Sequence, residues 1–475
     1  MNVGHIGPEL TLVVGAVVVL LAAAFLPRPA QWAATPLALG TVATAAAWSL
    51  WLGVTVPPQL TMMRAWALDG VTTGAELTIL TITALTLAMA HEWIATDPRR
   101  GEYPAIMLFS ATGAMLLAGA ADTMELIVGM LLVSVTGYTL AAYHRQSPAA
   151  VEAGMKYFLI GALTNAVLLV GVIVLFGLTG TTTMADIAAI LAAAPAQPVA
   201  IIAVIAAVGV GLAFEIGAVP AHAWVPDVAQ GAPAPSSAFL TVVPKIGATI
   251  ALARVLALLP LDGADWRVFA ALLAAATMTL GNLAALWQDD LRRLLGWSSV
   301  SQAGYALMAV VVLGRSDVAV PALVYFLAGY AIANTAAFGV VVELRGRTRI
   351  DDYRGLAAAR PVLAATLVVS LLSLVGIPPL AGFVGKLALF TAAIEAGYGW
   401  LAALAVANTV ASLFYYLRVL GPMYFDAGAA AEPAVVPVLG RWAGLAAVVG
   451  GVATLGIGLA AEPLLAALAN TPLLP

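Results

Sequence analysis

The chain has 475 residues, of which 63% are hydrophobic and 9% are charged, with a formal net charge of −4. This composition is typical of an integral membrane protein and excludes an ordinary soluble domain. The sequence has no cysteine, which excludes disulfides, thiolate metal sites and iron–sulfur clusters within the chain. Its apolar runs are continuous rather than alternating, which argues against a β-barrel.

Apolar runs long enough to cross a membrane recur from one end of the chain to the other. The first follows MNVGHIGPE, which lacks the basic region and cleavage site of a secretory signal, so we expect it to be retained. The twelfth is too long for one straight helix, and we expect two half-helices around GIPP, residues 376–379. The runs predict about 14 transmembrane helices, near residues 9–26, 31–52, 70–91, 104–119, 122–142, 150–178, 198–222, 236–259, 266–286, 294–313, 319–344, 362–396, 400–420 and 440–460.

The arginines are distributed unequally between the loops on the two sides of the membrane. Cytoplasmic loops are enriched in Lys and Arg. Only Arg64, Arg267 and Arg315 fall at loops after even-numbered helices. The asymmetry predicts a multi-pass protein with an even number of helices, both termini outside and residues 345–360 in the largest cytoplasmic loop. The arginines at loops after odd-numbered helices are Arg28, Arg99, Arg100, Arg145, Arg292, Arg293, Arg345, Arg347, Arg349, Arg354, Arg360, Arg418 and Arg441.

An internal similarity suggests a repeat. The sequence GAVP at residues 217–220, in the seventh helix, resembles GIPP at residues 376–379 in the twelfth. Broken helices in corresponding halves are typical of inverted-repeat transporters, in which the freed backbone lines a polar cavity. We therefore expect one membrane domain over residues 1–475. It would contain two inverted five-helix repeats, helices four to eight at 104–260 and helices nine to thirteen at 266–424, with helices seven and twelve broken.

The three lysines of the chain all lie inside predicted helices, whereas the loops use only arginine. They are Lys156, Lys245 and Lys386. A lysine at the centre of a membrane helix costs roughly 2.5–3.5 kcal/mol on insertion scales. Burial can lower the pKa of a lysine toward neutrality, so that it takes up and releases a proton, which an arginine does not do. The pattern predicts proton handling.

Each candidate residue also has a structural explanation. Lys386 could simply satisfy carbonyls freed by the helix break, and Lys156, two turns into its helix, could extend its charge to the cytoplasmic interface. Glu215 is either a proton carrier or the counter-ion of a lysine. His222 follows the first break, where a helix-end role and a proton relay are equally compatible with the sequence. Arg254 fits an ion-pair partner better than a proton carrier.

Motifs of soluble enzymes and of nucleic-acid binding are absent from any suitable context. The sequence has no dinucleotide or phosphate-binding loop, no nucleophile elbow and no metal-binding helix, and it has no basic aromatic stripe. We therefore expect no cofactor, no metal and no nucleic acid in this chain.

Several segments together resemble subunit N of bacterial respiratory complex I, the NADH–quinone oxidoreductase, which belongs to the antiporter-like membrane subunits. The resemblance extends from about residue 60 to residue 425, and its most specific block is HAWVPDVAQGAPAPSSAFL. It implies fourteen helices, two inverted repeats and a proton pathway in which Lys245 and Lys386 are the basic residues of helices eight and twelve. The other segments are EAGMKYFLIGAL, DDLRRLLGWSSVSQAGY, YAIANTAAFGVVVEL and LVGIPPLAGFVGKLALF.

The resemblance also implies a function. The chain would be a non-redox, proton-translocating subunit with no catalytic site of its own, driven by quinone reduction elsewhere in the complex. Its partners would be the other membrane subunits, the lipid bilayer and protons, and NADH, FMN, iron–sulfur clusters and quinone would belong to partner subunits. The expected proton path contains Glu215, Lys245 and Lys386, with Lys156 and His222 as further candidates.

Two positions depart from the family pattern. Leu131 stands where helix five of the relatives carries a glutamate, and Glu215 stands where their helix seven carries a lysine. We expect Glu215 to pair with Lys245 and to replace the missing acid. Two alternatives remain: a subunit of a multi-subunit sodium/proton antiporter, and a structural subunit whose channel has decayed, in which replacing Lys245 or Lys386 would leave pumping intact.

Overall fold

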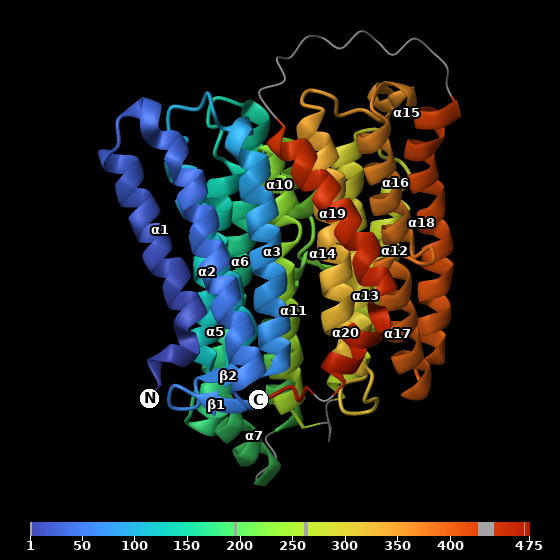
Figure 1. Cartoon of the computed structure of the whole chain (residues 1–475). Coiled ribbons are helices and arrows are strands. Elements are labelled where there is room, and N and C mark those ends of the chain that lie inside the picture. The colour runs from blue at the N-terminus through green and yellow to red at the C-terminus, as the bar shows by residue number, and fades with distance from the viewer. Residues whose placement is uncertain (1, 194–196, 261–264, 426–440, 470) are drawn as a thin grey trace.

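The computed structural model describes residues 2–193, 197–260, 265–425, 441–469 and 471–475. Within these residues the chain forms a bundle of helices, and both termini lie at the same end of it (Figure 1). Twelve helices of the described residues are long and apolar enough to cross a membrane. The prediction of a helical membrane protein is confirmed.

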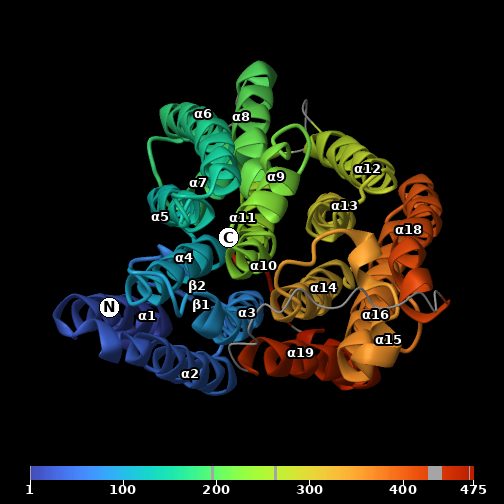
Figure 2. The same cartoon turned by 90° about the horizontal axis from the view of Figure 1, so that it is seen from above.

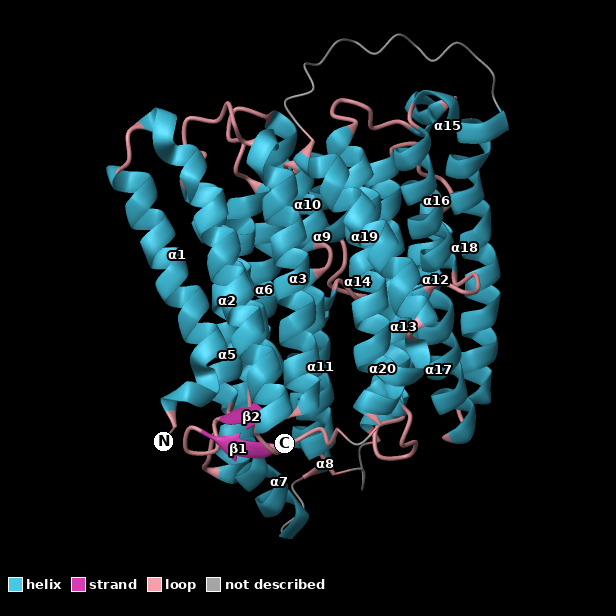
Figure 3. Ribbon diagram, viewed as in Figure 1, coloured by secondary structure: helices cyan, strands magenta, loops and turns pink. Residues whose placement is uncertain are grey.

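The N-terminal helices form one corner of the bundle, as the view along its axis shows (Figure 2). A short antiparallel hairpin of β1 and β2 follows them at the end where the termini lie (Figure 3). The elements are η1 (Val3–Ile6), α1 (Gly7–Phe25), η2 (Arg28–Ala33), α2 (Ala34–Thr55), β1 (Gln59–Thr61), β2 (Trp66–Leu68) and α3 (Gly70–Trp93).

The next part of the chain contains the first predicted break. The seventh predicted helix, residues 198–222, stops at Ile216, and a second helical segment that the sequence did not indicate follows the break as α9. The predicted helix at 236–259 is also divided, between α10 and α11. The elements are α4 (Glu102–Gly119), α5 (Thr123–Ala141), α6 (Pro148–Thr179), α7 (Met184–Ala193), α8 (Pro198–Ile216), α9 (Trp224–Gly231), α10 (Ala234–Leu240) and α11 (Val243–Leu258).

The remaining elements contain the second break, which lies at GIPP as expected and separates α16 from α17. The predicted start of the last helix, residue 440, lies outside the described residues. The elements are α12 (Trp266–Ala285), α13 (Leu291–Val311), α14 (Ala319–Glu343), η3 (Ile350–Tyr353), α15 (Leu356–Ala359), α16 (Pro361–Val375), α17 (Ala381–Glu395), α18 (Gly399–Phe425), α19 (Trp442–Leu459) and α20 (Ala461–Leu468).

Burial separates the helices into an inner and an outer set. The spans formed by α10 with α11, by α13 and by α14 are almost completely buried in the protein, and Figure 2 shows them toward the middle of the bundle. Outer helices such as α1, α6 and α18 expose large apolar side chains instead, as expected where lipid is the solvent. The inner helices are therefore the ones that can hold polar groups away from lipid.

The count of fourteen and the two inverted repeats at 104–260 and 266–424 stay predictions. Besides the twelve spans, α4 and the pair α16 and α17 belong to the same bundle. The short helix α15, in the arginine-rich loop, lies at the end opposite the termini (Figure 1). That arrangement agrees with an even number of crossings, and the side that faces the cytoplasm is still a prediction.

Candidate functional site

Two helices end inside the bundle at a glycine. Gly217 after α8 and Gly376 after α16 have left-handed backbone angles, φ 71° and φ 100°. A left-handed residue ends a helix, and glycine adopts this conformation without the steric cost that other residues meet. Each break leaves the last carbonyl groups of a helix without their usual partners in mid-bundle.

Lys245 occupies the first of these carbonyl ends. It is buried in the first turn of α11. Its Nζ donates hydrogen bonds to the carbonyl oxygen of Ile216, the last residue of α8, and to that of Ser299 on α13, the latter at 3.1 Å. The C-terminal end of a helix carries partial negative charge, which favours a cation at this place.

Lys386 occupies the second carbonyl end in the same way. It is buried on α17, and its Nζ donates to the carbonyl oxygens of Leu374 and Val375, both at 2.9 Å. The Nζ also lies 4.2 Å from the centre of the Tyr305 ring, where a cation is attracted by the face of the aromatic ring. Both buried lysines therefore bind to a broken helix end.

Helix α13 connects the two lysine sites. Its Ser299 accepts a hydrogen bond from Lys245, its Gln302 donates to the carbonyl of Leu374 at 2.9 Å, and its Tyr305 lies against Lys386. These three residues are spaced three apart, which places them on one side of a helix. The lysines thus lie on a continuous stretch of polar contacts rather than at isolated positions.

Hydroxyl and amide groups surround the division between α10 and α11. Thr241 is the central residue, since its carbonyl accepts from Ser299 Oγ at 2.9 Å and from the Tyr330 hydroxyl at 2.9 Å. Its own hydroxyl accepts from Asn334 at 3.2 Å, and Tyr330 also reaches Ser299 Oγ at 2.8 Å. Polar side chains of α13 and α14 therefore form hydrogen bonds with Thr241, which lies between α10 and α11 and within one turn of Lys245.

A second polar cluster extends from the Lys386 site toward α18. Thr409 Oγ1 donates to the Tyr305 hydroxyl at 3.2 Å. Asn282 donates to Asn408 at 3.1 Å and accepts from the Tyr415 hydroxyl at 3.0 Å. Tyrosine, threonine and asparagine side chains can pass protons or hold water, so α12 and α18 extend the polar stretch beyond Lys386.

Glu215 is buried on α8, one residue before the carbonyl that binds Lys245. Its carboxylate accepts hydrogen bonds from Ser134 of α5 at 2.5 Å and from the Tyr157 hydroxyl of α6 at 3.4 Å. Asn165 donates to Ser134 at 3.2 Å. Although both Glu215 and Lys245 are described, no ion pair or hydrogen bond joins them. The expected coupling of the two groups stays a prediction, and the bonds formed by the carboxylate go to α5 and α6 while Lys245 binds the end of α8.

Leu131 and Ser134, three residues apart on α5, differ in burial. The Leu131 side chain is 42% exposed on the outside of the chain, whereas Ser134 is buried and reaches Glu215. Leu131 places no carboxylate at its position of α5. The carboxylate of Glu215 contacts the same helix one turn further on.

Lys156 and His222 lie apart from the buried lysines. Lys156 is half-exposed and forms ion pairs with Glu152 at 2.7 Å and Asp227 at 2.9 Å, and Asp227 also binds Arg293 at 2.5 Å. The His222 ring centre lies 5.6 Å from that of Trp297, and among the described residues its Nδ1 has no hydrogen-bond partner. The structure brings neither residue into contact with Glu215, Lys245 or Lys386.

Several residues of this site were not identified from the sequence. The signal that could have found them is a hydroxyl, phenol or amide inside an apolar run, since lipid does not satisfy such groups. The segment WSSVSQAGY, residues 297–305, has this character, and so do single positions on α5 and α6. The residues are Ser134, Tyr157, Ser299, Gln302, Tyr305 and Tyr330.

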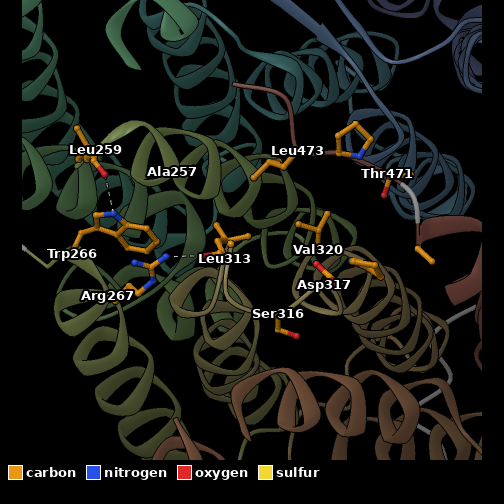
Figure 4. Close-up of a pocket in the computed structure, with 14 residues that line it drawn as sticks. Ala257, Leu259, Trp266, Arg267, Leu313, Ser316, Asp317, Val320, Thr471 and Leu473 are labelled. Carbon is orange, nitrogen blue, oxygen red and sulfur yellow. Dashed lines mark hydrogen bonds between the residues drawn. The ribbon is translucent and has the colours of Figure 1, made fainter. Parts of the chain in front are cut away.

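A pocket of about 880 Å³ opens where α12 and α14 begin, and it is lined in part by the C-terminal residues (Figure 4). Arg267 donates to the carbonyl of Leu313 at 2.8 Å, and the Trp266 indole donates to the carbonyl of Leu259 at 3.3 Å. None of the lysines, and neither Glu215 nor His222, is among its lining residues. The described residues contain no cluster of three or more His, Asp or Glu side chains that could hold a metal ion.

Broken helices with buried charged residues at their ends are typical of membrane proteins that translocate ions. Residues 120–412 match the model of the family described as NADH:quinone oxidoreductase/Mrp antiporter, transmembrane. The chain belongs to this family.

Within the family, the chain is similar to subunit N of NADH–quinone oxidoreductase. It is 44% identical to NADH-quinone oxidoreductase subunit N of Mycobacterium sp. (strain JLS), with 96% of each chain covered. It is also 44% identical to subunit N 1 of Streptomyces griseus, with 97% of this chain and 96% of the relative covered. The resemblance predicted from the motifs is confirmed.

Solved structures agree with this assignment. A chain of respiratory complex I from Thermus thermophilus with bound aureothin is 31% identical, with a TM-score of 0.82 and coverage of 97% of this chain and 99% of that chain. A chain of an archaeal membrane-bound sulfane sulfur reductase is 24% identical, with a TM-score of 0.86 and coverage of 98% and 96%. At that identity the second likeness concerns the fold alone.

Proposed function

We propose that this chain moves protons as a membrane subunit of a complex I-like NADH–quinone oxidoreductase. The observation that carries the proposal is the placement of Lys245 and Lys386, each buried and each bound to the carbonyl end of a broken helix. The relatives that are 44% identical are named subunits N of that enzyme, which favours this function over a sodium/proton antiporter subunit.

The carbonyl oxygens that bind the two lysines suit a side chain that gains and loses a proton. Carbonyl oxygens accept hydrogen bonds from an ammonium group and from a neutral amine alike. Neither lysine has a carboxylate in ion-pair contact among the described residues, and a carboxylate would favour the charged form strongly. Arg254 shows the contrast, because it is buried against the Asp69 carboxylate at 3.0 Å.

Glu215 has the modulating role in this proposal. Its carboxylate is held by Ser134 and Tyr157, and the next carbonyl along α8, that of Ile216, binds Lys245. A proton arriving at Glu215 would remove a negative charge close to the end of α8 and weaken the attraction for a charged Lys245. The proton could then pass along α13 toward Lys386.

The partners and location follow from the same proposal. The chain is a non-redox subunit without a catalytic site of its own, and NADH, FMN, iron–sulfur clusters and quinone belong to partner subunits. It lies in the bacterial inner membrane with both termini periplasmic, as the arginine distribution supports. The two five-helix repeats, 104–260 and 266–424, each supply one broken helix and one buried lysine.

The test uses the whole complex reconstituted in liposomes, with proton uptake followed by quenching of a pH-sensitive dye during NADH oxidation. Lys245→Met and Lys386→Met should each lose most of the pumping while the complex still assembles, because methionine fills the space without carrying a proton. Lys245→Arg should also fail, since arginine keeps the charge but does not release it.

Lys156→Met is the matched control, because it removes the third lysine of the chain from a half-exposed ion-pair cluster. We expect this variant to keep its pumping. Full pumping in both buried-lysine variants would instead identify a structural subunit with a decayed channel. Transport of radioactive sodium in place of protons would identify the antiporter alternative.

A further inference from the structure

Two carboxyl groups are buried in the N-terminal helices, away from the lysine sites. Glu9 on α1 is 4% exposed and Glu76 on α3 is 3% exposed. Glu76 accepts a hydrogen bond from Ser49 of α2 at 2.5 Å. Both carboxyl oxygens of Glu9 are buried, and among the described residues neither has a hydrogen-bond donor.

Among the described residues, acidic groups act on this pair. Glu9 and Glu76 act on each other electrostatically, Glu125 of α5 also acts on Glu9, and Asp69 acts on Glu76. Helix α2, which lies against both α1 and α3, has no charged residue. Helix α4 has one acid, Glu102, which is exposed at the first residue of that helix. The charged groups that act on the pair are therefore acids, and one of them, Asp69, is itself paired with Arg254.

Two ionised carboxylates cannot lie side by side in such a place without a large cost. Each loses its hydration on burial, and their mutual repulsion is stronger in a low-dielectric interior than in water. A buried carboxyl oxygen without a donor adds a further cost. One proton held between the two groups removes one charge and supplies the hydrogen bond that Glu9 lacks, as in other carboxyl pairs that share a site.

We propose that Glu9 and Glu76 share one proton and form a proton-binding site in the N-terminal helices. Ser49 fixes one oxygen of Glu76. Glu9 lies in the first turn of α1 and Glu76 in the second turn of α3. The site does not depend on proton pumping by the lysines, because α1 and α3 precede both predicted repeats. Its ligand is a proton.

The first measurement uses the native complex and needs no variant. Dicyclohexylcarbodiimide reacts with protonated carboxyl groups in apolar surroundings, and mass spectrometry of peptides locates the product. Glu9 or Glu76 should be modified at neutral pH. Asp69 is the internal control, since it is buried on the N-terminal side of α3 but paired with Arg254, and it should stay unmodified. Modification of neither glutamate would overturn the proposal.

The second measurement counts the protons by infrared spectroscopy. The E9Q/E76Q double variant should lose carbonyl absorption equal to one protonated carboxylic acid per chain relative to the native complex. Glu102→Gln, at an exposed position, should leave that absorption unchanged. Loss of the absorption of no acid or of two acids would contradict a shared proton. An acid band that disappears when sodium is added would also contradict it, because that result would identify a sodium site.

Discussion

At the scale of single residues, the charged groups of this chain separate into paired and unpaired ones. Arg254 is fully buried and binds Asp69 at 3.0 Å, the hydroxyl of Thr72 at 2.8 Å and the carbonyl oxygens of Ala118 and Leu474. Leu474 N–H in turn donates to Asp69 at 3.0 Å. One ion pair thus holds α3, α4, α11 and the C-terminal residues together, and its role is structural.

Arg254→Met should destabilise the chain strongly. Removal of one partner from a buried ion pair leaves an uncompensated charge and costs roughly 3–5 kcal/mol. The thermal unfolding midpoint in detergent should fall accordingly. Arg64→Met is the control, since Arg64 pairs with Asp186 at the surface and exposed pairs contribute about 0–1 kcal/mol. Equal midpoints for the two variants would show that the Asp69 pair does not stabilise the fold.

Glu215→Gln should slow proton pumping without preventing assembly. Glutamine keeps the shape, and its single amide oxygen can still accept from Ser134 or from Tyr157, but it carries no charge to influence Lys245. Ser134→Ala should have a smaller effect in the same direction, because the carboxylate would keep its bond from Tyr157. The check is dye quenching in liposomes at equal NADH oxidation rates. Native pumping in Glu215→Gln would remove Glu215 from the proton path.

At the scale of elements, the helix breaks position both lysines. A left-handed glycine ends α8 and another ends α16, and the carbonyls so released bind Lys245 and Lys386. Space is also limited there: a Cβ at Gly217 would lie 3.4 Å from the Lys245 Nζ, and one at Gly376 would lie 3.2 Å from the Lys386 Cδ. Backbone conformation and lysine position are therefore coupled at both breaks.

Gly217→Ala should reduce pumping more than Gly180→Ala. Both glycines have nearly the same left-handed angle, φ 71° and φ 69°, so each substitution carries a similar backbone cost of about 1–3 kcal/mol. Gly180 has open space around it, whereas Gly217 faces Lys245. The unfolding midpoint should fall in both variants, and further in Gly217→Ala, whose added Cβ would also lie 2.8 Å from Val225 Cγ2. Proton pumping per assembled complex should fall in Gly217→Ala alone. Equal proton pumping in the two variants would show that the helix break at Gly217 does not influence the proton path.

At the scale of the whole molecule, both termini lie at one end of the bundle and the arginine-rich loop lies at the other (Figure 1). The inner helices α11, α13 and α14 are enclosed by outer helices that present apolar side chains. A membrane around this bundle leaves the polar stretch from Lys245 to α18 shielded from lipid. The orientation of the bundle decides which end of that stretch meets the cytoplasm.

Single cysteines should report that orientation, since the native chain has none. Asp351→Cys, in the exposed part of the arginine-rich loop, should react with an impermeant thiol reagent only from the cytoplasmic side. Met63→Cys, exposed in the hairpin at the other end, should react from outside intact cells. The reverse pattern would show that the termini are cytoplasmic.

The sequence by itself determined the membrane class, the approximate helices, the two breaks and the three lysines worth attention. These follow from local properties: apolar run length, the effect of glycine and proline on the backbone, and the cost of charge in lipid. It also identified the family, through motifs that lie within single segments.

Only the tertiary structure decided which polar groups meet. The sequence could not show that Glu215 turns toward Ser134 instead of Lys245, that Asp227 holds Lys156 at a half-exposed position, or that α13 connects the two lysine sites. Partners such as Ser134 and Glu215 are separated by tens of residues, and their contact depends on how helices rotate and cross when they pack. That geometry is set by the whole bundle and not by any one segment.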